Sequence, residues 1–140
     1  MPQNDAFRAL GRQECLRLPA GVPVGRVIRT GQALPAVLPV NFSLDTDASV
    51  LLATSPGSDP VRAVDGTVVA FEADEFHAEN RSGRSVVVTG RAAVVTGPAG
   101  HERLVRTGPA SWTPLRETVF VRIGAEMVTG RGIGGATAGR

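Results

Sequence analysis

The sequence contains no lysine and no tyrosine, and its 15 basic residues are all arginines. Without a lysine the chain cannot form the Schiff base of pyridoxal-phosphate or aldolase-type enzymes. It also cannot supply the lysine of a nucleotide-binding P-loop. A tyrosine acting as a general acid is excluded in the same way. These absences narrow the enzyme classes before any motif is considered.

Cysteine is almost absent as well, because Cys15 is the only one. A single cysteine excludes an intramolecular disulfide and a zinc site built from several thiolates. Cys15 lies beside leucines and has no histidine near it in the sequence, so we expect a buried structural thiol rather than a nucleophile. The acidic residues between 74 and 79 do not follow the spacing of a calcium loop. We therefore expect no metal site.

Long apolar runs and an excess of charge are missing too. No apolar stretch approaches the roughly 18 residues that a membrane span needs. Residues 1–10 lack the apolar segment of a secretory signal, which favours a cytoplasmic protein. The net charge is +2, and Arg131 and Arg140 supply it, because residues 1–129 hold 13 arginines and 13 acidic residues. A neutral body lacks the clustered positive charge of a nucleic-acid groove, so we expect neither nucleic acid nor a membrane as partner.

What the sequence does contain is a series of short valine-rich segments separated by turns. They predict strands at residues 22–30, 34–44, 50–54, 67–72, 85–95 and 119–123, and a seventh if residues 127–129 form one of their own. Short helices are expected within residues 5–18, at 60–64 and at 98–106. The spacing predicts a mainly β protein, a small antiparallel barrel of six to seven strands with short flanking helices. Residues 1–129 form a single domain in this interpretation, and the Gly-rich residues 130–140 form a flexible tail.

The segment 34–44 is unusual because it carries Pro35 and Pro39. A proline cannot donate to a strand ladder, so this segment should lie at a sheet edge or face something other than a strand, such as a flat ligand. No catalytic acid, base or nucleophile stands out, and His77 and His101 are expected to be exposed. Trp112, the only tryptophan, either covers a ligand cleft of a partner subunit or packs at the barrel end or at a dimer interface.

Six short segments together resemble one family. The sequence is similar to the pyridoxamine 5'-phosphate oxidase-like superfamily, in its nitroimidazole-reductase-like branch. The segments that carry the resemblance are Val24-Gly25-Arg26-Val27, residues 34–42 (LPAVLPVNF), Gly57-Ser58, residues 68–72 (VVAFE), residues 85–92 (SVVVTGRA) and residues 119–123 (VFVRI). They follow the family's order and spacing and cover residues 10–130.

The resemblance implies a split β-barrel that forms a homodimer and binds FMN in a cleft between the subunits, with deazaflavin as an alternative cofactor. The backbone of Leu38, Pro39, Val40 and Asn41 would line the isoalloxazine ring. The phosphate and ribityl chain would be held by three hydroxyl residues and one arginine: Thr54, Ser55, Ser58 and Arg62. A flavin would supply the redox chemistry, which explains the lack of a recognisable catalytic residue.

The sequence departs from the family at two positions that commonly contact the phosphate. Leu34 stands where the family often has arginine, and Asp59 stands where it has a basic residue. A carboxylate near a phosphate dianion repels it. Arg84 likewise replaces a common aromatic residue. Three interpretations therefore stay open: an FMN-dependent oxidoreductase with a small organic acceptor, a degenerate or non-catalytic ligand-binding module, and a deazaflavin-dependent reductase.

Overall fold

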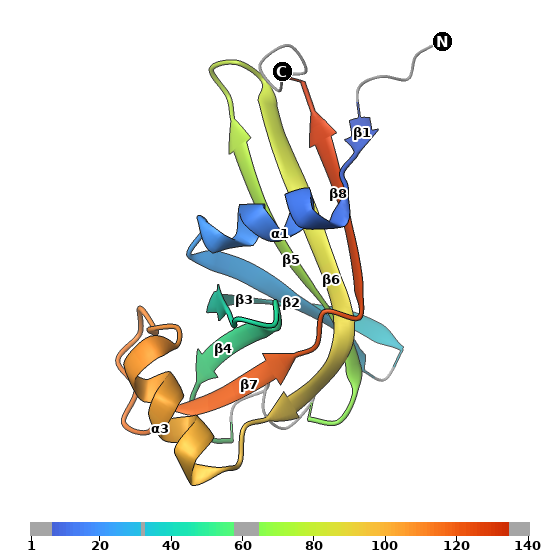
Figure 1. Cartoon of the computed structure of the whole chain (residues 1–140). Helices are drawn as coiled ribbons and strands as arrows, with labels where there is room; N and C mark the ends of the chain where they lie inside the picture. Colours follow the sequence, from blue (N-terminus) through green and yellow to red (C-terminus); the bar gives the residue numbers. More distant parts are fainter. Residues whose placement is uncertain (1–6, 32, 58–64, 135–140) are drawn as a thin grey trace.

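The computed structural model describes residues 7–31, 33–57 and 65–134 (Figure 1). Its elements, in chain order, are β1 (Phe7–Ala9), α1 (Arg12–Ala20), β2 (Val24–Gly31), β3 (Leu34–Leu44), β4 (Val50–Thr54), β5 (Val68–His77), β6 (Ser82–Val94), α3 (Pro98–Thr107), β7 (Val119–Ile123) and β8 (Met127–Ile133). In this described part of the chain no helix is long and apolar enough to cross a membrane. The helix predicted at residues 60–64 lies outside the described residues.

Six of the strands form a closed ring. The order β6-β5-β2-β3-β4-β7 returns to β6, because β7 pairs with both β4 and β6. β8 pairs with the other half of β6, and β1 adds to β8. Figure 1 shows β5, β6 and β8 standing as long strands that β2 and β3 cross at a steep angle. The predicted mainly β barrel with short helices is confirmed.

The longest strand, β6, belongs to two parts of the sheet. Residues 83–89 of β6 pair with β8, and Ala92, Ala93 and Val94 pair with β7. The change of partner falls at Gly90, where a side chain would collide with the backbone carbonyl of Gly124. Gly90 therefore allows the close approach of two backbones at the point where the barrel closes.

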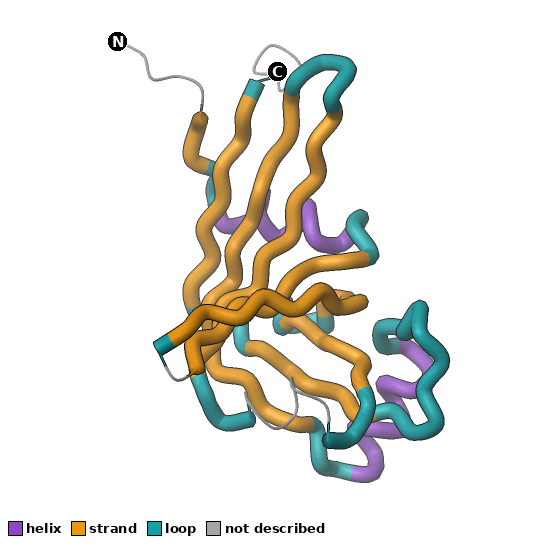
Figure 2. Tube along the Cα trace, turned by 180° about the vertical axis from the view of Figure 1, so that it is seen from behind, coloured by secondary structure: helices purple, strands orange, loops and turns teal. Residues whose placement is uncertain are grey.

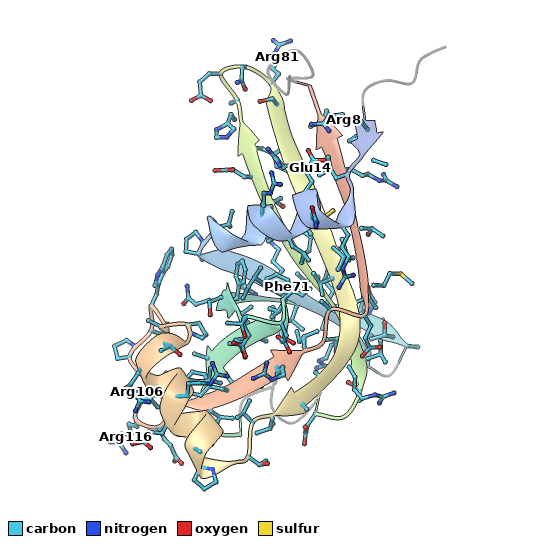
Figure 3. All side chains as sticks on the ribbon, in the orientation of Figure 1. Arg8, Glu14, Phe71, Arg81, Arg106 and Arg116 are labelled. Atoms are coloured by element: carbon cyan, nitrogen blue, oxygen red, sulfur yellow. The ribbon has the colours of Figure 1, made fainter. Side chains whose placement is uncertain are left out.

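The main core fills the barrel and continues under α1. Phe71 lies at its centre (Figure 3) and packs edge-on against Phe42, with ring centres 4.6 Å apart. Cys15 of α1 is fully buried in the same cluster, as predicted. A side chain at Gly130 of β8 would collide with the Cys15 sulfur. The helix can therefore lie close against β8 only because this position is glycine.

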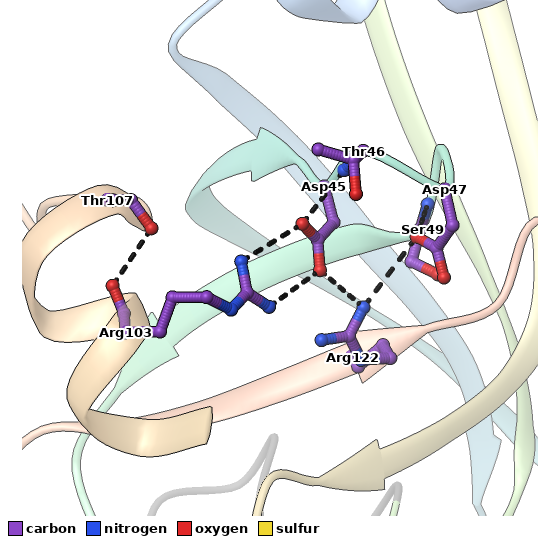
Figure 4. Close-up of polar contacts among 7 residues, drawn as sticks. All are labelled: Asp45, Thr46, Asp47, Ser49, Arg103, Thr107 and Arg122. Atoms are coloured by element: carbon purple, nitrogen blue, oxygen red, sulfur yellow. Dashed lines mark hydrogen bonds and ion pairs between the residues drawn. The ribbon is translucent and has the colours of Figure 1, made fainter. Parts of the chain in front are cut away.

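A second, smaller cluster lies under α3, where Leu104 packs with Leu51, Ala53 and Phe120. One carboxylate ties this helix to the barrel (Figure 4). Asp45, in the turn after β3, accepts two hydrogen bonds from Arg103 of α3, at 3.3 and 3.0 Å, and one from Arg122 of β7, at 2.8 Å. These bonds hold the pKa of Asp45 well below its usual range, with the Arg103 bond as the largest cause.

The other face of the long strands is turned away from α1, as the view from behind shows (Figure 2). We call it the outer face. In β5 and β6 alternate residues are buried on the α1 side, and those between them, such as Glu72, Asp74, Ser85 and Val87, lie on the outer face. Among the described residues no helix covers it. Its side chains are therefore available to a ligand or a partner.

Three details differ from the sequence-based expectation. There are eight strands in the described residues rather than six or seven. Residues 7–9, expected within a helical stretch, form β1 instead and pair with β8. The strand expected at residues 67–72 continues to His77, because its polar end pairs with β6 across a tight turn. Local polarity indicated a connection there, but a long partner strand provides the hydrogen bonds that keep this segment extended.

The first residues of the tail expected from residue 130 form a strand instead. Gly130, Arg131, Gly132 and Ile133 belong to β8, which pairs with β6 along its length and with β1 at its end. The glycines at 130 and 132 indicated flexibility in the sequence. The structure gives a different reason for a glycine at position 130, because a side chain there would collide with Cys15 of α1. Residues 135–140 lie outside the described part of the chain.

Candidate functional site

The first half of β3 has a strand on one side only. Residues 34–41 pair with β2, whereas only Phe42, Ser43 and Leu44 pair with β4. No described strand pairs with the other edge of residues 34–41. Pro35 and Pro39 both lie in this half, and because they are four residues apart their missing N–H groups fall on the same edge of the strand. The prediction of an edge position for residues 34–44 is confirmed for residues 34–41, whereas residues 42–44 pair with β4.

The barrel opens where β3 and β4 separate. β4 continues past Leu52, its last partner of β3, and pairs with β7 up to Thr54. Ser55 follows directly, and Gly57 closes the turn with a positive φ of 75°. The structure thus brings together two groups of predicted site residues. Leu38 to Asn41 lie on one side of the split, and Thr54 with Ser55 lies on the other.

The four predicted ring-lining residues divide between the two faces of β3. Val40 points inward and packs against the core, and Leu38 is half-buried on the same face. Pro39 and Asn41 lie on the outer face with Val37, which is 57% exposed. Leu34, where the family often has arginine, is 70% exposed. The split is therefore bordered by a free backbone edge and by exposed apolar side chains.

Two other predicted residues cannot be placed. Ser58 and Arg62 lie outside the described residues, as does Asp59. Within the described ranges, no group of three or more His, Cys, Asp or Glu side chains could hold a metal ion. Among the described residues, Arg26 of β2 pairs with Pro39 of β3 across the ladder.

Arg26 belongs to a polar cluster that the sequence did not predict as a unit. Its guanidinium donates to Glu72 at 2.9 Å and to Asp74 at 3.3 Å, and the Ser85 hydroxyl donates to Glu72 at 2.9 Å. Burial, followed by the contact with Asp74, raises the pKa of Glu72. Each residue lay in a recognised segment or in the acidic stretch. Only the strand register shows that all four share the outer face.

The loop between α3 and β7 reaches back to the site. The backbone N–H of Trp112 donates to the side-chain carbonyl of Asn41 at 2.8 Å. The Asn41 amide group in turn donates to the carbonyl of Pro23 at 3.2 Å. The Trp112 side chain is 71% exposed, so the interpretation that it plugs the barrel end is wrong. Its position beside Asn41 leaves the other two interpretations, a ligand cover or an interface residue.

Comparison with known proteins agrees with this geometry. The chain is 42% identical over 129 residues to the uncharacterized protein Rv0080 of Mycobacterium tuberculosis, covering 86% of this chain and 82% of that protein. Among solved structures, the FAD-binding protein of Mycobacterium smegmatis aligns with a TM-score of 0.80 and 31% identity, over 91% of this chain and 98% of that one. An FAD-binding protein of Mesorhizobium loti aligns with a TM-score of 0.73 and 27% identity, over 90% and 96%.

The sequence profile of the family matches nearly the whole described chain. The family described as pyridoxamine 5'-phosphate oxidase covers residues 11–132, which includes α1, the six strands of the ring and most of β8. The match therefore spans both sides of the split between β3 and β4. From this match, the protein belongs to the pyridoxamine 5'-phosphate oxidase family.

Proposed function

We propose that this protein is a flavin-dependent oxidoreductase that acts as a cytoplasmic homodimer on a small organic acceptor. The observation that carries the proposal is the split between β3 and β4. One side of the split is a strand edge without a described strand partner, and the other is the hydroxyl-bearing end of β4. A bound flavin would supply the electron transfer itself, and the chain would hold and orient it.

The proposed roles follow from the chemistry of each side of the split. The edge of Leu38 to Asn41 offers backbone C=O groups, and N–H groups from its residues other than Pro39, for hydrogen bonds with the polar edge of an isoalloxazine ring. The exposed side chains of Leu34 and Val37 suit its apolar edge. Thr54, Ser55, Ser58 and Arg62 are the residues proposed for the ribityl chain and phosphate. Arg62 is the cation in this set, and an arginine binds phosphate through its bidentate fork.

The choice of flavin is part of the proposal. The family resemblance favours FMN, whereas two structural relatives are named as FAD-binding proteins. FMN and FAD share the ring and the first phosphate, so the split would receive the same half of either molecule. We propose FMN as the minimal cofactor that uses every site residue named above. A deazaflavin has a ring system similar to that of a flavin, so it would contact the same strand edge.

The outer face supports the homodimer. Beside the split it carries exposed apolar side chains on three strands, including Val37 of β3, Val68 of β5 and Met127 of β8. Large exposed apolar groups spread over one sheet face are typical of a surface that meets another protein. A second copy of this chain would cover them and enclose the flavin between two sheets, which creates two equivalent sites.

The first experiment is a visible absorption spectrum of the purified protein, followed by titration with FMN, FAD and riboflavin. We expect a flavin spectrum, or tight uptake of added flavin. Ser55→Ala should weaken FMN binding and leave riboflavin binding unchanged, because riboflavin has no phosphate. Ser82→Ala, at the start of β6 and distant from the split, is the matched control. Equal weakening of FMN and riboflavin by Ser55→Ala would place Ser55 on the ribityl chain instead of the phosphate, and unchanged binding of both flavins would contradict its place in the site.

A second candidate is a ligand-binding module without flavin chemistry. It is favoured by the 70% exposed Leu34, which leaves an apolar group where the family often places a cation. Asp59→Lys separates the two candidates, because it replaces the repelling charge by the expected one. Flavin uptake only in the substituted protein would support the degenerate module. Uptake by the natural protein, followed by reduction with a nicotinamide and reoxidation by an organic acceptor, would support the oxidoreductase.

A further inference from the structure

A cavity of about 450 Å³ lies over the paired strands β6 and β8 on the outer face, away from the split. It is lined by Ser85, Val87, Thr129, Gly130 and Arg131. The side chains come from two neighbouring rows of the ladder, because Ser85 is opposite Arg131 and Val87 is opposite Thr129. Its volume is within the range of small-molecule sites.

The cavity and the split are separate places on the outer face. The registers of the paired strands place Pro39, Arg26, Glu72, Val87 and Thr129 in one row across the sheet. Four strand spacings of about 4.8 Å each separate Pro39 from Thr129, or roughly 19 Å along the sheet. A ligand in the cavity therefore does not occupy the flavin site proposed on β3 of the same chain.

Arg131 gives the cavity a cation with free hydrogen-bonding capacity. In the described part of the chain, no carboxylate forms an ion pair with it. Its guanidinium carbon instead lies 5.9 Å from the centre of the Phe7 ring. A guanidinium above an aromatic ring is attracted by the ring face and keeps its in-plane N–H groups available to an anion. The hydroxyl of Thr129 lies in the adjacent row and can add a donor.

Next to the cavity, β5 carries two carboxylates, because Glu72 and Asp74 are opposite Val87 and Ser85 in the ladder. Ser85 donates its hydroxyl proton to Glu72, and Glu72 shares the guanidinium of Arg26 with Asp74. Both carboxylates therefore pair with the same cation, Arg26 of β2. A ligand with a second negative charge would meet repulsion there, whereas an uncharged ring would lie over Val87. The cavity thus offers Arg131 as the partner of one anionic group and Val87 as an apolar contact surface beside it.

We propose that this cavity binds a small planar organic monoanion, an aromatic carboxylate in its simplest form. Its carboxylate pairs with the fork of Arg131, and its ring lies on Val87 between β6 and β8. The proposal uses residues that the flavin site of the same chain does not need. The cavity lies on the outer face, so in the proposed homodimer a second copy would cover it and the ligand would be enclosed at the subunit interface.

The test uses the full chain and three probes: benzoate, the uncharged and nearly isosteric benzamide, and inorganic phosphate. Binding is measured at low ionic strength by calorimetry and by ligand-observed NMR, without added flavin. We expect saturable binding of benzoate and much weaker binding of both other probes. Arg131→Ala should weaken benzoate binding about tenfold or more, as expected for loss of a charge-assisted hydrogen-bond pair. Arg131→Lys should restore part of the loss, because it keeps the charge but not the fork.

Arg8→Ala is the matched control. Arg8 lies on the neighbouring strand β1 but on the opposite face, where it pairs with Glu14 at 3.5 Å (Figure 3). It changes the net charge by the same amount and should leave benzoate binding intact. The proposal is overturned if benzoate does not bind, if benzamide or phosphate binds as tightly, or if Arg8→Ala weakens benzoate as much as Arg131→Ala does. Circular dichroism of each variant shows whether the sheet is retained.

Discussion

The side chain of Asn41 holds the loop that carries Trp112. Its carbonyl oxygen accepts the Trp112 backbone N–H at 2.8 Å, and its amide group donates to Pro23 at 3.2 Å. One amide thus connects β3, the start of β2 and a loop 71 residues away in the sequence. The sequence resemblance gave Asn41 a role through its backbone. The structure adds a positioning role for its side chain.

Loss of this amide should free the loop. Asn41→Ala removes both hydrogen bonds, and we expect a stability loss of about 1 kcal/mol together with a more mobile Trp112. The readout is specific because the chain contains one tryptophan and no tyrosine. A lower steady-state anisotropy of tryptophan fluorescence is the expected result. Asn80→Ala, at an exposed turn, should leave the anisotropy unchanged, and an unchanged anisotropy in Asn41→Ala as well would contradict the positioning role.

Asp45 should make the protein sensitive to acid. Its pKa is lowered, chiefly by the hydrogen bonds from Arg103, so its contribution to stability is complete above the unfolded-state pKa of about 4 and is lost as the pH falls towards the folded-state value. We expect Asp45→Asn to cost about 2 kcal/mol at pH 7 and less at pH 3. Urea unfolding across this pH range measures the difference.

The control for Asp45 is the exposed Glu117. Glu117→Gln should change the free energy of unfolding by a few tenths of a kcal/mol at any pH, as exposed charges usually do. If Asp45→Asn shows the same small, pH-independent change, the attachment of α3 does not depend on this carboxylate.

Glu72 should behave in the opposite way. Burial raises its pKa, so the folded state favours the protonated form, and stability is lost as the pH rises through the folded-state pKa. Glu72→Gln removes the charge and should therefore gain stability relative to the natural protein as the pH rises above the unfolded-state pKa of about 4. Thermal unfolding at several pH values gives the trend. A relative stability that falls with rising pH would show that the Arg26 pair outweighs the burial of Glu72.

Gly90 should not tolerate a side chain. A methyl group there collides with the carbonyl of Gly124, a backbone atom that cannot rotate away. We expect Gly90→Ala to lose about 1–3 kcal/mol or more in chemical unfolding. Gly97→Ala is the matched control, because a side chain at that position meets no atom. If the two variants are equally stable, the close approach of Gly90 to Gly124 is not required for closing the barrel.

Cys15 should be inert in the folded protein. Its side chain is fully buried, and burial is the largest cause of its raised thiol pKa. We expect no reaction with a thiol reagent under native conditions and one equivalent of reaction in urea. Arg106→Cys, which places a thiol on the exposed side of α3, should show one rapidly reacting group in the same assay. Rapid native reaction of Cys15 would indicate that α1 opens readily from the sheet.

The sequence by itself determined the mainly β class, the barrel and most of its strands. Alternating valine-rich segments bury one face wherever they pair, so their pattern is visible without a structure. It also predicted an edge position for residues 34–44, because Pro35 and Pro39 restrict strand pairing locally, and the structure places residues 34–41 of this segment at an edge. The burial of Cys15 was likewise predicted from its apolar neighbours in the sequence.

The tertiary structure alone decided which distant residues meet. The cluster of Arg26, Glu72 and Ser85, the cavity beside Arg131 and the link from Asn41 to Trp112 all depend on strand register or on a returning loop. A shift of one residue in register would move each strand side chain to the other face. Local sequence fixes the alternation of faces but not the pairing between strands. These contacts follow from the closed barrel as a whole.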